Sequence, residues 1–232
     1  PGDPPRTLRP VLWGDGAEML MPATRQHRDP AIDATDTRTP EGAQIFDPDR
    51  TTLGTAQRDW LLDGLTGSSR RWKGLGNSYN LAMWRLEDLD DGTRPLPPGV
   101  HPNEGVYAPN EAWDDYWAER RALLDAVAAQ GVENLVSLSG HTHIWIAAAL
   151  SPDPDDAASP VAGYDFTCGS LTADPDLIGQ AVGNGATPEA AHAFYRNLAE
   201  ASRVINPWQA YVNFTNFGYG VARFGRDELV VE

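Results

Sequence analysis

Cysteine is almost absent from this sequence. Cys168 is the only one in 232 residues, so no disulfide can form within the chain. The redox compartment stays undecided, because exported proteins without disulfides are common. Cys168 follows an apolar strand candidate and has no base beside it in sequence, which predicts a small buried side chain rather than a nucleophile. A cysteine hydrolase is therefore not expected.

Long hydrophobic runs are also missing. The longest apolar stretch, residues 144–150, is far shorter than the roughly 18 to 20 residues that cross a bilayer. The start, Pro1-Gly2-Asp3-Pro4-Pro5, has neither an initiator Met nor the basic and apolar regions of a signal peptide. We expect no transmembrane segment, and we expect the chain to be a fragment of a longer protein.

Basic residues are scarce. The chain has 18 Lys and Arg against 33 Asp and Glu, a net charge of −15, which repels nucleic acid and anionic membranes. The eight Trp residues are therefore expected to fill core and pocket walls rather than to stack on bases. If the substrate is a phosphoester, bound metal cations are the most direct way to reverse the local potential.

The remaining composition, with 41% hydrophobic and 22% charged residues, is typical of a folded globular chain. Apolar spacing and turn residues predict a mixed α/β fold in one domain, with no internal repeat. The predicted strands are 17–21, 72–75, 134–138, 162–167, 211–216, 219–224 and 229–231, and the predicted helices begin near Thr52 and span 111–130 and 188–203. The proline-rich segment 88–110 is expected to be a loop.

Two histidines carry the strongest chemical signal. His141 and His143 follow the apolar strand candidate 134–138 in a short loop that Gly140 opens. An extended backbone at this point directs both imidazoles to one side, and neutral imidazole is a natural metal ligand. Gly140 is expected to make the sharp turn. Open α/β sheets bind ligands where their strands end, so the pair predicts a metal site at a sheet edge.

The segment from Leu138 to His143 resembles the last motif of the calcineurin-like metallophosphoesterases, Gly-His-x-His. In that superfamily the two histidines bind a dinuclear metal centre, which activates a water or hydroxide for in-line attack at phosphorus. The resemblance implies that His141 and His143 are metal ligands here. It also implies hydrolysis of phosphate esters.

Other segments are similar to the PhoD-like alkaline phosphatases and phosphodiesterases, a group that includes some phospholipases of D-type specificity. The matching blocks occur in the family's order along most of the chain: residues 24–29, 52–61, 72–77, 113–121, 206–207 and 218–220. The resemblance implies that residues 1–232 are the C-terminal part of a PhoD-like catalytic domain. That domain is an α/β (α+β) β-sandwich flanked by helices. A small-molecule or lipid phosphoester as substrate and a secreted or extracytoplasmic location are implied as well.

Two departures from the family pattern matter. The family usually has Asp where His141 stands, and imidazole is a softer ligand than carboxylate, so iron, calcium, zinc and manganese all stay open as the metal. The earlier metal motifs of the family have no counterpart in this sequence. We therefore expect an N-terminal fragment of the same protein to complete the site.

Further candidates are weaker. Asn77 in a Gly-Asn turn is assigned a catalytic role as a neutral donor to the phosphate, although such turns also occur for their left-handed geometry alone. Trp145, just after the histidines, is assigned to the substrate pocket. Asp114 and Tyr116, at the start of the predicted helix, are expected to be architectural. Arg120 and Arg121 are expected to form an ion-paired, solvent-exposed face of that helix, and His27, His101 and His192 are expected on the surface.

Two alternative functions remain. A purple-acid-phosphatase-like enzyme shares Gly-His-x-His, but Ile144-Trp145-Ile146 is less typical of that group than of the PhoD-like one. A non-catalytic scaffold could keep the fold and use its acidic surface for protein contacts. Bound metal distinguishes the scaffold from an enzyme.

Overall fold

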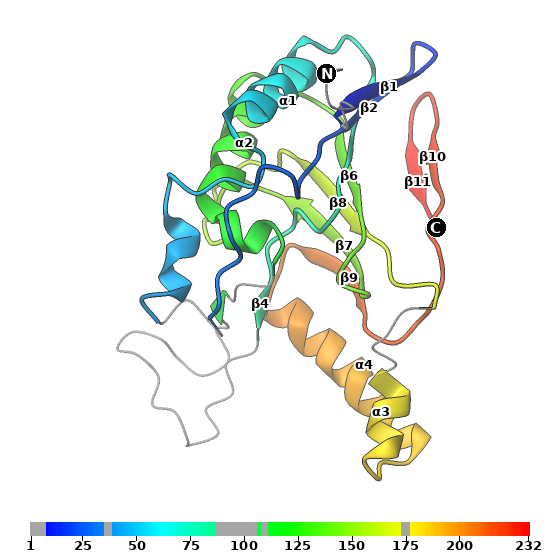
Figure 1. The fold of residues 1–232 in the computed structure, drawn as a ribbon. Helices are drawn as coiled ribbons and strands as arrows, with labels where there is room; N and C mark the ends of the chain where they lie inside the picture. Colours follow the sequence, from blue (N-terminus) through cyan, green and yellow to red (C-terminus); the bar gives the residue numbers. More distant parts are fainter. Residues whose placement is uncertain (1–7, 35–38, 87–105, 108–110, 173–176) are drawn as a thin grey trace, which may run out of the picture.

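A computed structural model describes residues 8–34, 39–86, 106–107, 111–172 and 177–232. Its centre is a seven-stranded sheet in the order β1-β2-β3-β6-β8-β7-β9 (Figure 1). The strands are β1 (Arg9–Trp13), β2 (Ala17–Met21), β3 (Trp72–Gly76), β6 (Leu135–Ser139), β7 (Trp145–Leu150), β8 (Gly163–Thr167) and β9 (Gln209–Asn213). The predicted α/β (α+β) class is confirmed by this mixed sheet and the helices beside it.

Four neighbouring strands of this sheet run parallel. β2, β3, β6 and β8 pair in that way, whereas β1 is antiparallel to β2, and β7 is antiparallel to β8 and β9. The carboxyl ends of the parallel strands therefore lie at one edge of the sheet. Because β7 runs in the opposite direction, its first residue lies at that same edge. The segments after β2, β3 and β6 and the start of β7 are thus brought together.

Two helices cover one face of the sheet. They are α1 (Thr55–Gly67) and α2 (Trp117–Ala129), and α2 continues the 3-10 turn η2 (Trp113–Tyr116). Their apolar residues, including the fully buried Leu61 of α1 and Leu124 of α2, pack on strand residues such as the fully buried Leu75 of β3. Parallel strands are normally buried on both faces, and this helical layer buries one of them.

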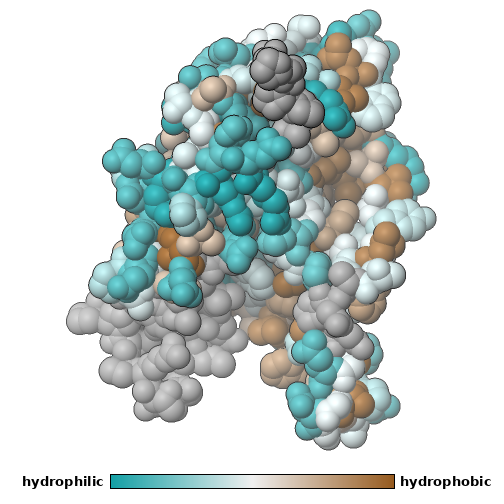
Figure 2. All heavy atoms as spheres, in the orientation of Figure 1, coloured by the Kyte–Doolittle hydropathy of each residue, from teal (hydrophilic) through white to brown (hydrophobic). Residues whose placement is uncertain are grey.

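The opposite face of the sheet is only partly covered. The hairpin of β10 (Ala222–Phe224) and β11 (Leu229–Val231) packs there, with Trp72 and Phe224 in edge contact at 6.2 Å between ring centroids. Beside it lies a recess of about 790 Å³ whose lining includes Val136 and Phe166, and Tyr164 on the same face is 54% exposed. Figure 2 shows hydrophobic surface in the recess between the central strands and this hairpin.

The remaining elements lie around the sheet. Helix α4 (Pro188–Ile205) packs on β9 through Ala199, Val212 and Phe214, and it projects away from the sheet with α3 (Leu177–Gly183) (Figure 1). Strands β4 (Arg85–Leu86) and β5 (Val106–Tyr107) form a small antiparallel pair, and η1 (Gly42–Phe46) is a short 3-10 helix. Within the described residues, no helix combines the length and hydrophobicity that a membrane crossing requires.

Several expectations about single elements need correction. The region 8–50 holds β1 and η1 besides the expected strand, and β5 falls inside the segment expected to be loop, most of which lies outside the described residues. The arginine pair on α2 is not a solvated face. Arg120 is 1% exposed, and its guanidinium donates to the carbonyl oxygens of Leu81 and Pro152 at 2.7 and 3.4 Å. Arg121 is the more exposed of the two and pairs with Asp153.

Candidate metal site

The candidate site residues meet at the carboxyl edge of the parallel strands. Arg25 follows β2, Asn77 follows β3, and His141 and His143 follow β6, while Trp145 opens β7 at the same edge. The strand order places β2, β3 and β6 side by side. Residues separated by more than a hundred positions in the sequence are therefore neighbours in space.

The backbone of the histidine loop is left-handed at both histidines. His141 has a φ of 79° and His143 a φ of 58°, a region that bulky side chains rarely adopt. The expected extended backbone is therefore wrong, and the turn depends on the two histidines rather than on Gly140. Residues held in this way cluster at functional sites, because the surrounding fold must offset their conformational cost.

His141 lies against an arginine and an aromatic ring. Its Nδ1 is 3.2 Å from Nη2 of Arg25, and its ring centroid is 5.8 Å from that of Tyr79. Partial desolvation lowers the pKa of His141, and the charge of Arg25 lowers it further. Both causes favour the neutral imidazole, which is the form that binds metal ions.

Asn77 is held at the end of β3 by its backbone. Its N–H donates to the carbonyl of Leu138 at 2.9 Å, and its Oδ1 accepts the N–H of Ser78 at 3.1 Å. The side chain is 8% exposed, and its Nδ2 has no hydrogen-bond partner among the described residues. An unsatisfied donor next to the histidine loop is a group that a ligand or another segment can satisfy.

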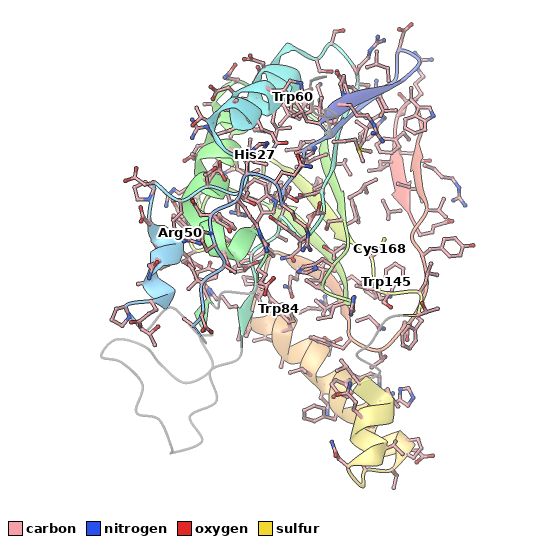
Figure 3. All side chains as sticks on the ribbon, viewed as in Figure 1. His27, Arg50, Trp60, Trp84, Trp145 and Cys168 are labelled. Carbon is pink, nitrogen blue, oxygen red and sulfur yellow. The ribbon has the colours of Figure 1, made fainter. Side chains whose placement is uncertain are left out.

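Trp145 lines a cavity beside the histidines. Its indole Nε1 donates to the carbonyl of Asn216 at 2.7 Å, and the ring packs against Gly169 and Gly218. Figure 3 shows Trp145 and Cys168 close together. The cavity has a volume of about 500 Å³, and its other aromatic residues are Phe166, Tyr211, Phe217 and Tyr219. Cys168 lines it as well and is half-buried rather than fully buried.

The residues at this edge fit part of a metal site. Two neutral imidazoles are suitable ligands for zinc or iron. Within the described ranges, however, no group of three or more His, Cys, Asp and Glu side chains could hold a metal ion. Protein metal sites generally use three or more ligands, so His141 and His143 are a partial set.

The other polar candidates lie apart from this edge or in the framework. Asp114 is fully buried and accepts the N–H of Trp84 at 2.9 Å, and Tyr116 donates from its hydroxyl to the carbonyl of Asp29 at 2.5 Å. Both are architectural, as expected. His27 and His192 are exposed, also as expected, and His101 lies outside the described residues.

Sequence reasoning overlooked Arg25 and Tyr79. Arg25 lies in one of the matched segments and Tyr79 lies two residues beyond another, each after a strand end, yet neither carries a motif that marks it as functional. The strand order makes the segments after β2 and β3 neighbours of the histidine loop. The two residues can therefore be recognised only when that order is known.

Comparison with known proteins identifies the family. The model of the PhoD-like phosphatase family matches residues 1–232, and the chain belongs to that family. It is 28% identical over 207 residues to alkaline phosphatase D of Bacillus subtilis (strain 168), which covers 89% of this chain and 32% of that protein. Of the two phosphatase groups that Gly-His-x-His left open, the PhoD-like one is therefore the match.

A solved structure shows the same fold. The chain matches one described as "Structure of PhoD" with a TM-score of 0.66 and 20% sequence identity, over 97% of this chain and 40% of that one. The chain thus spans about a third of the curated relative and two fifths of the solved chain.

Proposed function

We propose that this chain carries part of the active site of a metal-dependent phosphoester hydrolase that acts on phosphate monoesters or diesters. The observation that carries the proposal is the pair His141 and His143, held in left-handed backbone at the carboxyl edge of the sheet. Membership of the PhoD-like phosphatase family supports it. Open α/β sheets bind their ligands at this edge.

The residues at the edge have distinct proposed roles. His141 and His143 would hold part of a dinuclear metal centre of iron, calcium, zinc or manganese. A bound metal ion supplies polarisation of phosphoryl oxygens and a nucleophile at neutral pH. Asn77 offers the N–H of its unsatisfied amide to a phosphoryl oxygen, and Trp145 forms an apolar wall for the alcohol portion of the ester.

A second part of the proposal concerns what completes the site. Residues 1–232 would form the C-terminal part of the catalytic domain, and an N-terminal segment of the same protein would bring the remaining metal ligands. The partly covered sheet face, with its recess of about 790 Å³, supports this, because sheets with parallel strands are normally covered on both faces. The length of the relatives beyond the matched third is consistent with such a segment.

The proposed substrate and location rest chiefly on the family. A small-molecule or lipid phosphoester suits a cavity walled by Trp145 and other aromatic residues, and phospholipase D-like action on a lipid diester is one form of this chemistry. A secreted or extracytoplasmic location is proposed on the family resemblance. The net charge of −15 argues against nucleic acid as the substrate.

Replacing a ligand tests the proposal. The full-length protein is assayed on a nitrophenyl phosphate monoester and a bis-nitrophenyl diester, beside the variants His143→Ala and His192→Ala. His192 is exposed near the start of α4, a helix that projects away from the sheet (Figure 1). We expect His143→Ala to abolish turnover and His192→Ala to keep it. Unchanged turnover in His143→Ala would refute the assignment, and no hydrolysis by the unaltered protein would favour a scaffold.

A further inference from the structure

Arg25 lies at the candidate site in a defined position. It belongs to the segment after β2, and its Nη2 is 3.2 Å from Nδ1 of His141. Its guanidinium carbon is 5.7 Å from the centroid of the Tyr79 ring, a cation–π distance. The arginine is therefore held between a ligand candidate and an aromatic ring.

The ring beneath Arg25 is rigid. Tyr79 is fully buried, and its hydroxyl lies 2.8 Å from the carbonyl oxygen of Thr24 and 2.6 Å from Oγ1 of Thr52. The N–H of Thr52 donates in turn to the buried Glu119 at 2.6 Å. An arginine stacked on such a ring loses little additional freedom when it binds a ligand.

The charge of Arg25 is not neutralised by a carboxylate in the described part of the chain. Arg25 forms no ion pair with any of those residues, whereas Arg28, three positions away, lies 3.7 Å from a carboxylate oxygen of Glu111. This contrast occurs in a chain with 33 acidic residues. A solvent-exposed guanidinium with unused donors suits an anionic ligand.

Metal binding at His141 would release Arg25 from its present contact. The guanidinium is only a donor, so Nδ1 of His141 accepts from it through a lone pair. Ligation through Nδ1 uses that lone pair, and ligation through Nε2 leaves the proton on Nδ1. Either mode removes the acceptor. Arg25 then presents its N–H groups to the site while it remains over the ring of Tyr79.

We propose that Arg25 binds the phosphoryl oxygens of the substrate at this site. The inference deepens the proposed function and rests on it, because it assumes that His141 holds a metal beside the bound phosphate. A guanidinium matches two phosphate oxygens at once, and lysine cannot reproduce that geometry. Arg25 is thus a substrate-binding residue, distinct from the metal ligands.

Phosphate affinity tests this role directly. The dissociation constant of inorganic phosphate is measured by isothermal titration calorimetry for the full-length protein and its Arg25→Ala, Arg25→Lys and Arg28→Gln variants, with metal content by elemental analysis. Loss of charge-assisted hydrogen bonds should raise the constant about 10- to 100-fold in Arg25→Ala. Arg25→Lys should be intermediate, Arg28→Gln within about twofold of the unaltered protein, and the metal content constant throughout.

Several results would overturn the proposal. Unchanged affinity in Arg25→Ala would show that the side chain does not bind phosphate, and equal losses in Arg28→Gln would show a general field effect. Loss of metal from Arg25→Ala would show that the arginine supports His141 instead. If Arg25→Ala fails to fold, Arg25→Lys decides by the same criteria. In each case hydrolysis by the unaltered protein still supports the proposed function, whereas absence of both hydrolysis and phosphate binding rejects both proposals.

Discussion

One carboxylate oxygen of Asp165 accepts the backbone N–H of Leu81 at 3.0 Å, which links β8 to the segment that follows β3. The same oxygen accepts the N–H of Ala82 at 3.1 Å, and Arg120 donates to the carbonyl of Leu81 at 2.7 Å. Asp165 and Arg120 are both buried. Together they fix a segment that carries Asn77 and Tyr79, so the site depends on a buried polar network behind it.

Removal of the Asp165 carboxylate should therefore destabilise the protein. In Asp165→Ala, two buried N–H groups lose their acceptor and Arg120 loses a nearby negative charge. We expect the free energy of unfolding to fall by about 2 to 5 kcal/mol. Urea denaturation measures it. Asp59→Ala, at an exposed position of α1, is the control and should change stability by less than about 0.5 kcal/mol. Equal effects of the two substitutions would contradict the role given to Asp165.

Glu119 should make stability depend on pH. Burial raises the pKa of Glu119 above its usual 4.5, and hydrogen bonds from Thr51, Thr52 and Leu53 oppose the rise. Because the folded state binds this proton more tightly than the unfolded state, the contribution of Glu119 to stability is full below pH 4.5 and is lost as the pH rises through the raised pKa.

Glu119→Gln isolates this effect. The variant has no carboxyl group at this position, so the unfolding free energy of the unaltered protein minus that of the variant should fall as the pH rises above about 4.5 and then level off. Urea denaturation across that range measures the difference. A difference that stays constant, or that grows with pH, would show that the pKa of Glu119 is not raised.

Asn77 should affect turnover more than stability. Asn77→Asp keeps the oxygen that accepts from Ser78 and replaces the unsatisfied Nδ2 donor by an oxygen. If that donor binds a phosphoryl oxygen, kcat/KM should fall about 100-fold. The matched control is Asn197→Asp on the exposed side of α4, with no expected change. Full activity in Asn77→Asp would show that Asn77 contributes to the turn and not to catalysis.

The Trp145 cavity should select for the size of the ester. Trp145→Ala is expected to raise KM about tenfold for a bis-aryl diester and to leave KM for a small alkyl monoester unchanged. Gly169→Ala should act similarly, because the added methyl group would collide with the indole of Trp145. Gly67→Ala, where nothing lies within 4 Å of the added atom, is the control. Equal changes for both substrates would place the cavity outside the binding site.

Sequence pattern predicts those elements whose burial is periodic. The residue pattern predicts helix α4, and the apolar run predicts β6. In the structure Thr187 also caps α4 by accepting the N–H of Ala190. Strand β1 was not predicted, because its residues are largely exposed, with Trp13 at 68%. Arg120 was misread for a related reason: its burial depends on α2 facing residues 81 and 152, which local charge cannot reveal.

The sequence also predicts part of the candidate site, namely the part that lies in one contiguous segment. Gly-His-x-His marks a short contiguous segment, so His141 and His143 were found without the fold. Arg25 reaches His141 across 116 positions, and this contact exists only because β2, β3 and β6 are adjacent and parallel. The left-handed backbone of both histidines was also hidden, since histidine does not favour that region strongly enough to predict it.

Metal stoichiometry tests the central claim most directly. Elemental analysis is carried out on the full-length protein, purified without chelator, and on the double variant His141→Ala, His143→Ala. Two metal ions per molecule of the unaltered protein, and a loss of metal in the variant, are the predicted result. No bound metal in the unaltered protein, or the same metal content in both, would contradict the claim that these two imidazoles hold the catalytic centre.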